Sequence, residues 1–249
     1  MSRLARSLGL IATSSLALLG ACSSSSRTDN TARDQQNLVE QATTIVSTTF
    51  NDPQHKRPQE LLKKSRAVMI CPSISNVSLV FGGSGGHCVL LSRDARNSWS
   101  DPAFYHIGSG SFGLQLGYQN TQLVLFITSK NGLQALLDHQ FTFDANASAS
   151  FTTLSGSAQD SNVSGAGSDI YVMEKSNGVF VGASIGGSKL TSDSTADRNY
   201  YHQQVGPEDI VINMRVNNSA ADPLRRALMK AGGEQTTTMK QHDISEAPL

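Results

Sequence analysis

The sequence lacks the features that define several large classes of protein. Charge of one sign is not in excess, because 20 lysine and arginine residues are balanced by 20 aspartate and glutamate residues. A nucleic-acid-binding protein would carry a strong basic surplus, so we expect no nucleic-acid partner. The apolar stretch over residues 8–19 is too short to span a bilayer as a stable helix. The six histidines are scattered without the short spacings of metal ligands, and we predict neither a metal site nor a cofactor.

The amino terminus has the pattern of an export signal. Arg3 and Arg6 precede the apolar stretch, and small residues followed by Cys22 end it. The sequence Leu-Gly-Ala-Cys resembles the lipobox of bacterial lipoproteins, in which the cysteine receives diacylglycerol and becomes the mature amino terminus. We therefore predict a signal peptide over residues 1–21 and lipidation, palmitate included, at Cys22. The alternative is an ordinary secreted protein with a chance cysteine at the cleavage site.

The segment after Cys22 is polar and of low complexity. Such a segment buries too little apolar surface to order itself, so we predict a flexible tether over residues 22–33. Ser23 stands where an aspartate would be expected to retain a lipoprotein in the inner membrane. The predicted location is the bacterial envelope, at the outer membrane, facing the periplasm or the surface. Cleavage would leave 18 basic residues against 20 acidic ones.

Two further cysteines, Cys71 and Cys88, lie in apolar, strand-like runs joined by a glycine-rich segment. Outside the cytoplasm they could form a disulfide across adjacent strands. The alternative is a pair of buried thiols that pack as small hydrophobic side chains. The sequence leaves both open, because it does not show whether the two side chains face each other.

Hydrophobic periodicity predicts two helices followed by many short strands. Apolar residues recur every three or four positions over residues 34–50, and Pro58 suits the first turn of a second helix that ends at Lys64. Beyond it, apolar and alternating runs separated by glycine-rich turns, among them residues 82–86, predict strands. We expect an α+β fold with a mostly antiparallel, curled or barrel-like sheet and a few short helices, the amino-terminal ones packed on it. One domain would cover residues 34–231, followed by a disordered tail over residues 232–249.

Two glycine motifs suggest chemistry but lack the required context. Residues 108–113 match the dinucleotide pattern G-x-G-x-x-G, yet the residues that follow alternate as a strand instead of opening a helix, so a glycine-bent strand is favoured. Residues 82–86 match G-x-S-x-G around Ser84, where a nucleophile would need a strand-to-helix turn. A strand-like segment follows, which makes a serine hydrolase the weaker alternative.

A basic cluster surrounds the second predicted helix, and its members are Lys56, Arg57, Lys63, Lys64 and Arg66. Basic residues near an anionic membrane contribute about 1 kcal/mol each to its attraction. The cluster therefore suggests contact with anionic or phosphorylated lipid headgroups. The alternative is a solvated helix face without a ligand.

Several blocks in order resemble the SYLF domain family. They span most of the chain after the signal and lie at residues 58–68, 85–93, 99–104, 108–117, 124–127, 178–184 and 199–201. The resemblance implies lipid binding without catalysis, since eukaryotic members bind phosphoinositides and yeast members also bind actin. The family's lipid contact is attributed to its amino-terminal amphipathic and basic segment, which here carries the basic cluster.

The resemblance and the export signal together predict a membrane-anchored envelope lipoprotein whose SYLF-like domain binds lipid headgroups and is not an enzyme. Phosphatidylglycerol, cardiolipin and lipid A are the anionic lipids that a bacterial envelope offers. Actin is not expected as a partner unless the protein meets a host cell. The leading alternative is a protein–protein interaction module that docks another envelope protein, a host protein or peptidoglycan.

Overall fold

A computed structural model describes residues 25–50, 56–78, 81–112, 117–154, 167–176, 179–181 and 185–233. The predicted signal peptide, the lipidation site Cys22 and most of the predicted tail lie outside these residues. Within the described part, no helix combines the length and the apolar character needed to cross a membrane.

The described residues form one nine-stranded sheet. The strands are β1 (Ala67–Ser78), β2 (Phe81–Ser92), β3 (Ala103–Phe112), β4 (Gly117–Ile127), β5 (Gln140–Thr142), β6 (Phe151–Leu154), β7 (Ile170–Ser176), β8 (Val179–Val181) and β9 (Lys189–Ser192). Their spatial order is β5-β9-β3-β2-β1-β4-β7-β6, with β8 also paired to β7. All neighbours are antiparallel except β6 and β7. The predicted fold class, a mostly antiparallel curled sheet in an α+β domain, is confirmed.

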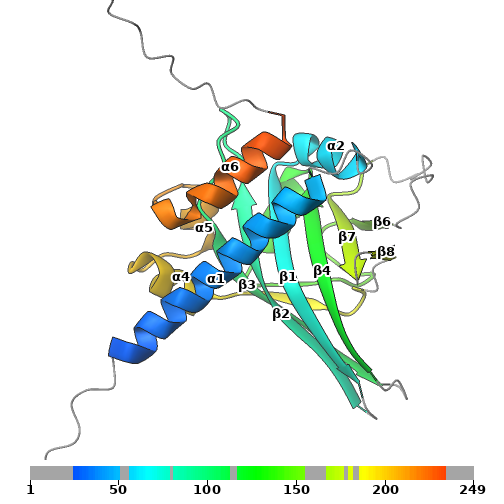
Figure 1. The fold of residues 1–249 in the computed structure, drawn as a ribbon. Coiled ribbons are helices and arrows are strands. Elements are labelled where there is room, and N and C mark those ends of the chain that lie inside the picture. Colours follow the sequence, from blue (N-terminus) through cyan, green and yellow to red (C-terminus); the bar gives the residue numbers. More distant parts are fainter. Residues whose placement is uncertain are drawn as a thin grey trace, which may run out of the picture.

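Helices from the amino-terminal and the carboxyl-terminal parts of the chain cover the sheet. They are α1 (Ser25–Phe50), α2 (Lys56–Lys64), α3 (Lys130–Leu137), α4 (Ser194–Tyr201), α5 (Pro207–Val211), the short 3₁₀ helix η1 (Ser219–Ala221) and α6 (Asp222–Ala231). In Figure 1, α1 and α6 cross in front of the sheet, α2 lies at the top, and the long strands β1, β2 and β4 extend beyond the helices at the bottom.

The first helix is held by its apolar face. Val39, Ala42, Ile45, Val46 and Phe50 are at most 5% exposed, and the Phe50 ring meets Phe126 of β4 edge to face at 5.9 Å. Each fully buried aliphatic or aromatic side chain of this kind contributes about 1.5–3 kcal/mol. A polar contact also holds α1 to α4, because the Tyr200 hydroxyl donates to Gln36 Oε1 at 2.9 Å. Helix α1 is therefore an integral part of the core.

The structure corrects the predicted tether. We expected residues 22–33 to be irregular, but α1 begins at Ser25. Extending a helix that is already nucleated and packed needs only one further residue to be fixed per hydrogen bond, so a polar sequence can continue it at little cost.

The glycine-rich segment at residues 82–86 is also not the turn that we predicted. It forms part of β2 and pairs with β1 on one side and with β3 on the other. Strand β1 runs from Ala67 to Ser78, and its register with β2 shifts between Ile70 and Ser73. A Cβ atom on Gly86 would lie 2.5 Å from the Ser73 carbonyl oxygen beside this bulge. Glycine here permits a close approach of two strands, and that role is easily mistaken for a turn.

Cys71 and Cys88 form a disulfide between β1 and β2, next to the same bulge. Both residues are fully buried. Of the two alternatives that the sequence left open, the structure shows the covalent pair.

The expectation that the helices gather at the start of the chain was wrong. Helices α4, α5 and α6 follow the last strand, and α6 buries Leu224 and Leu228 against the core. The sequence of α6 has ordinary features of a helix: Pro223 stands in the first turn, and the two buried leucines are four positions apart.

Candidate functional site

A cavity of about 320 Å³ opens where β1 begins, β2 ends, and α3 and α5 come together. Its lining combines basic with apolar side chains: Arg66, Ser92, Arg93, Asp94, Lys130, Leu133, Gln134, Leu137, Val211, Ile212 and Met214. Three of the charged members are basic and one is acidic, so the site favours an anion. The apolar members come from α3 and from the segment around the end of α5.

Backbone pairing places the arginines. The Arg66 amide donates to the Ile127 carbonyl at 2.8 Å, and the Arg66 carbonyl accepts from the Arg93 amide at 2.7 Å. The two residues therefore sit at adjacent strand ends and are held to the rim by the sheet itself. On the opposite side, the Ser92 hydroxyl donates to the carbonyl oxygen of Val211 and thereby fixes the end of α5 on β2.

Arg93 links the cavity to the basic helix α2. Its guanidinium lies 4.5 Å from the centre of the Trp99 ring, a cation–π arrangement that orients it. Its Nη atoms also donate to the carbonyl oxygens of Leu62 and Lys63, at 3.3 and 3.4 Å. These carbonyls belong to the last turn of α2, where a cation is favoured by the helix dipole. The exposed side chains of Lys63 and Lys64 are therefore neighbours of the cavity.

Asp169 fixes α3 and with it the Lys130 side of the cavity. Its carboxylate accepts hydrogen bonds from Ser129, the N-cap of α3, and from Asn131 and Ser150. Burial alone would raise the pKa of Asp169, but these hydrogen bonds outweigh it and lower the pKa to about 2. The carboxylate is thus ionised at any physiological pH, and the position of α3 does not depend on its titration.

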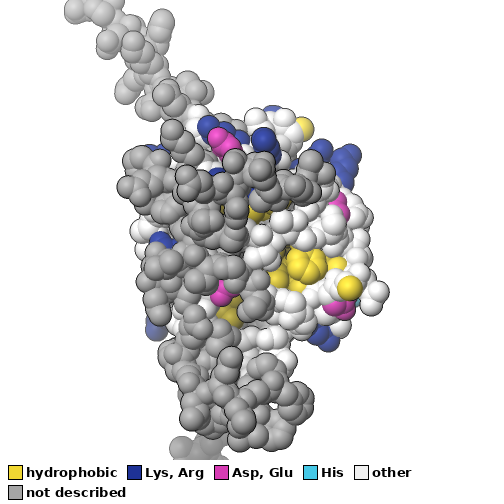
Figure 2. All heavy atoms as spheres, turned by 90° about the vertical axis from the view of Figure 1, so that its right-hand side faces the viewer, with side chains coloured by type: hydrophobic (Ala, Val, Ile, Leu, Met, Phe, Trp, Pro, Cys, Tyr) yellow, Lys and Arg dark blue, Asp and Glu magenta, His cyan; other side chains and the backbone are white. Residues whose placement is uncertain are grey.

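The rim also presents an apolar side chain to solvent. Ile212 is 46% exposed, although it is a large hydrophobic residue. In Figure 2, which faces the side of the molecule that carries β6, β7 and β8, lysine and arginine side chains gather along the upper edge, and a hydrophobic patch lies lower. At the cavity itself, the basic lining residues and Ile212 match a ligand with an anionic head and an apolar body.

Comparisons with known proteins point to one family. The family described as "Las17-binding protein actin regulator" (Ysc84) matches residues 108–231. Similar proteins include Protein YSC84 of Saccharomyces cerevisiae, 26% identical over 174 residues that cover 69% of this chain and 37% of the yeast protein. SH3 domain-containing YSC84-like protein 1 is 25% identical in Bos taurus and 21% in Homo sapiens, in each case over 73% of this chain and 53% of the relative.

The chain belongs to the Ysc84, or SYLF-domain, family. It spans about half the length or less of these curated relatives, so what it shares with them is the domain and not the whole protein. Helices α3 and α5, which line the basic cavity, fall within the matched residues 108–231, whereas Arg66 and the end of β2 precede them.

The structure brings together part of the predicted lipid-binding cluster. Arg66 lines the cavity, and Lys63 and Lys64 are exposed at the adjoining end of α2. Arg57 is half-buried, and the Lys56 side chain lies outside the described residues. The resemblance attributes lipid contact to an amphipathic and basic amino-terminal segment, and within that segment the apolar face of α1 is buried in the core. Arg93, at the end of β2, and Lys130, at the start of α3, also line the cavity, and neither was predicted from the sequence.

Ser84 does not lie in a nucleophile elbow. It stands within β2, paired on both sides, and its hydroxyl oxygen is 2.6 Å from that of Ser109 on β3. The G-x-G-x-x-G segment likewise falls on a strand as far as Phe112, as predicted.

A second group of polar side chains meets at another place on the sheet. His87 of β2 and His106 of β3 are directly paired across the strands, with ring centres 4.5 Å apart. His106 Nε2 lies 2.6 Å from Asp193 Oδ2. These three residues could hold a metal ion, because one donor atom from each lies within 4.8 Å of the others. Our prediction that no histidines are arranged as metal ligands considered spacing along the chain only and missed this group.

Proposed function

We propose that the protein is a lipid-anchored component of a bacterial envelope whose SYLF domain binds anionic lipid headgroups without catalysing a reaction. The observation that carries the proposal is the cavity with Arg66, Arg93 and Lys130 around it and the exposed Ile212 at its mouth. A phosphate would be attracted to the basic side chains, and the glycerol and first methylenes of the lipid would lie against Ile212. The proposed point of contact keeps Arg66 of the predicted basic cluster and adds Arg93 and Lys130.

Binding should therefore depend on the cavity residues more than on overall charge. We expect the non-acylated protein, carrying Cys22→Ser, to bind phosphatidylglycerol vesicles and to bind phosphatidylcholine vesicles weakly. Neutralising both Arg66 and Lys130 with glutamine should weaken binding by about 2 kcal/mol, or roughly 30-fold, because each basic residue near an anionic surface contributes about 1 kcal/mol. Raised salt should weaken binding in the same direction. Vesicle co-sedimentation at several salt concentrations measures both effects.

A matched control changes the same charge elsewhere. Lys189 on β9 and Arg226 on α6 are exposed and do not line the cavity. The double variant Lys189→Gln/Arg226→Gln should retain most of the binding. If the two double variants lost vesicle binding equally, the effect would be one of net charge, and the cavity would not be the binding site.

The anchor can be tested separately. We expect the membrane fraction of a bacterium that produces the full chain to contain a form beginning at Cys22 with the mass of added diacylglycerol. Intact-mass measurement checks this, and the Cys22→Ser protein should lack the added mass. An unmodified mature chain in the culture fluid would contradict the anchor but leave the lipid-binding proposal standing.

A second candidate function is the binding of a protein partner. It is favoured by the description of the family as Las17-binding and by the relatives named for it, such as LAS seventeen-binding protein 3 of Saccharomyces cerevisiae. For this chain the corresponding partner would be another envelope protein. Stoichiometric capture of one protein from detergent-treated envelopes, undiminished in Arg66→Gln/Lys130→Gln, would favour this function over lipid binding.

A further inference from the structure

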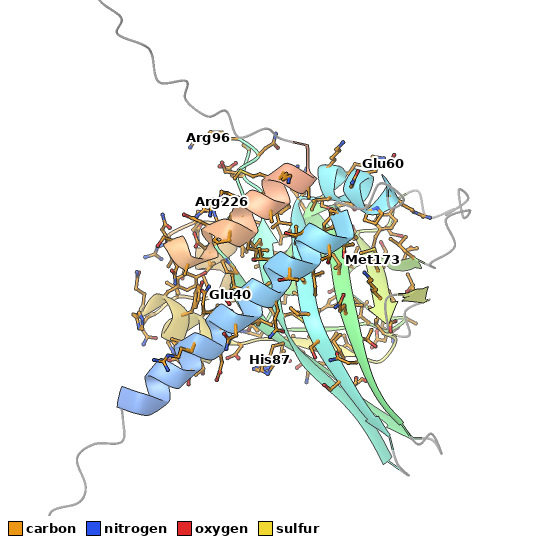
Figure 3. The ribbon with its side chains drawn as sticks, viewed as in Figure 1. Glu40, Glu60, His87, Arg96, Met173 and Arg226 are labelled. Atoms are coloured by element: carbon orange, nitrogen blue, oxygen red, sulfur yellow. A yellow bond between two sulfur atoms is a disulfide. The ribbon has the colours of Figure 1, made fainter. Side chains whose placement is uncertain are left out.

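We propose that His87, His106 and Asp193 form a binding site for a divalent transition-metal ion, with zinc the ion that best fits the donors. The site is separate from the basic cavity and does not depend on the function proposed for it. In Figure 3, His87 lies low on the sheet beside α1, whereas Arg96 and the labelled residue of α2, Glu60, lie at the top of the molecule.

The donor set is one that zinc and its neighbours prefer. Imidazole nitrogens and carboxylate oxygens bind Zn²⁺ at about 2.0–2.2 Å, and sites with three protein ligands leave a fourth position for water or for a substrate. In a tetrahedral site with bonds of this length, donor atoms lie roughly 3.3 Å apart. The three donors here are within 4.8 Å of one another, with His106 and Asp193 at 2.6 Å. Small side-chain rotations would therefore bring them to coordinating distances.

The backbone holds the three residues in place before any ion binds. His87 and His106 are cross-strand partners in the β2–β3 pair, so their side chains leave the same face of the sheet. Asp193 is the N-cap of α4, and its Oδ1 accepts from the Ala196 amide at 2.9 Å. The Asp193 amide also donates to the Phe104 carbonyl at 2.8 Å. Capping occupies one carboxylate oxygen and directs the other, Oδ2, toward His106.

The exposure of the group suits metal binding. His87 is exposed, the side chain of His106 is 48% exposed and that of Asp193 is 17% exposed, so an ion can enter from solvent without any opening of the fold.

A bound ion would connect the end of β9 and the start of α4 to the middle of the β2–β3 pair. The buried disulfide leaves Cys71 and Cys88 unable to compete for the ion as thiolates. Because the ion binds the folded arrangement, zinc should raise the unfolding temperature, and the rise should grow with the logarithm of the free zinc concentration once that exceeds Kd.

The test uses the mature chain without a histidine tag, treated with chelator, dialysed and kept oxidised. Calorimetric titration with zinc chloride should show one Zn²⁺ per chain. His106→Ala and Asp193→Asn should each weaken binding by at least about tenfold, because each removes one of three protein ligands. Asparagine at position 193 can still accept the capping hydrogen bond, so this variant tests the ligand without removing the cap.

His139→Ala is the matched control, since His139 is exposed and lies outside the group. It should bind zinc as the parent does, and zinc should raise the unfolding temperature of the parent and of this control but not of the other two variants. The absence of saturable binding by the parent, or equal binding by all four proteins, would overturn the proposal. Cobalt in place of zinc provides an independent reading, because a tetrahedral site gives visible absorption that His106→Ala should abolish.

Discussion

At the scale of single residues, Asp197 is a buried carboxyl group whose hydrogen bonding is incomplete within the described core. It is fully buried in α4, and its Oδ1 accepts from the Phe104 amide at 2.9 Å. Its Oδ2 has no hydrogen-bond partner within the described residues. Burial raises the pKa of Asp197 to about 8, aided by Asp193 and opposed by the Phe104 amide and Arg198. The carboxyl group is therefore protonated in the folded protein at neutral pH.

A pH dependence follows from this shift. Between about pH 4 and pH 8 the folded state keeps the Asp197 proton while the unfolded chain loses it, so this group makes stability fall as pH rises. Asp197→Asn preserves the shape and the acceptor without a titratable proton. We expect the variant to gain about 1–3 kcal/mol relative to the parent on going from pH 5 to pH 8. Urea unfolding at both pH values measures the difference.

Asp138→Asn, a change at an exposed aspartate, serves as the control and should leave the pH dependence of the parent unchanged. An Asp197→Asn protein whose stability falls with pH as steeply as that of the parent would show that another group is responsible.

At the scale of secondary structure, Gly86 sets how closely β1 and β2 approach at the bulge. A Cβ at this position would lie 2.5 Å from the Ser73 carbonyl oxygen and 3.2 Å from the Ile74 Cα. Both are backbone atoms in a paired strand, so the added methyl group must displace the strand itself. We expect Gly86→Ala to destabilise the protein by about 1–3 kcal/mol, as overpacking of a well-packed region does. Thermal unfolding followed by circular dichroism checks this.

The control is on the same strand. A Cβ on Gly83 would have its nearest neighbour, the Ser109 carbonyl oxygen, at 3.7 Å, which is ordinary contact. Gly83→Ala should therefore leave the unfolding temperature almost unchanged. If Gly83→Ala and Gly86→Ala lowered the unfolding temperature equally, the loss would come from replacing a glycine in this strand and not from the close approach at Gly86.

The elements differed in how well the sequence predicted them. The helix over residues 34–50 was predictable because its apolar residues repeat with the period of a helix, and the mostly antiparallel sheet followed from alternating apolar runs. The glycines at residues 82–86 were predicted to form a turn but lie in β2, because glycine occurs both in turns and where two strands approach closely. For the candidate sites, Arg66 was visible as part of a basic run. His87 and His106 are neighbours only through the register of β2 and β3, which no spacing along the chain discloses.

At the scale of the whole molecule, the Cys71–Cys88 disulfide ties the two central strands of the sheet across 17 positions of sequence. Closing a loop of this length restricts the unfolded chain by about 3 kcal/mol. Reduction, or the double variant Cys71→Ala/Cys88→Ala, should therefore lower the free energy of unfolding by about 2–4 kcal/mol. Denaturant unfolding with and without reductant measures it. The double variant is its own control, since reductant should not affect it further.

The length of α1 limits how the anchored protein can sit on a bilayer. Its 26 residues extend about 39 Å at 1.5 Å per residue. The proposed acyl group at Cys22 precedes its first residue by three positions, whereas α2 and the basic cavity come after its last. A molecule that engages one leaflet at both ends must lie lengthwise along it. A molecule that stands upright on its acyl chains would instead hold its phosphate-attracting end away from its own membrane, toward the cell wall or the opposite membrane of the envelope.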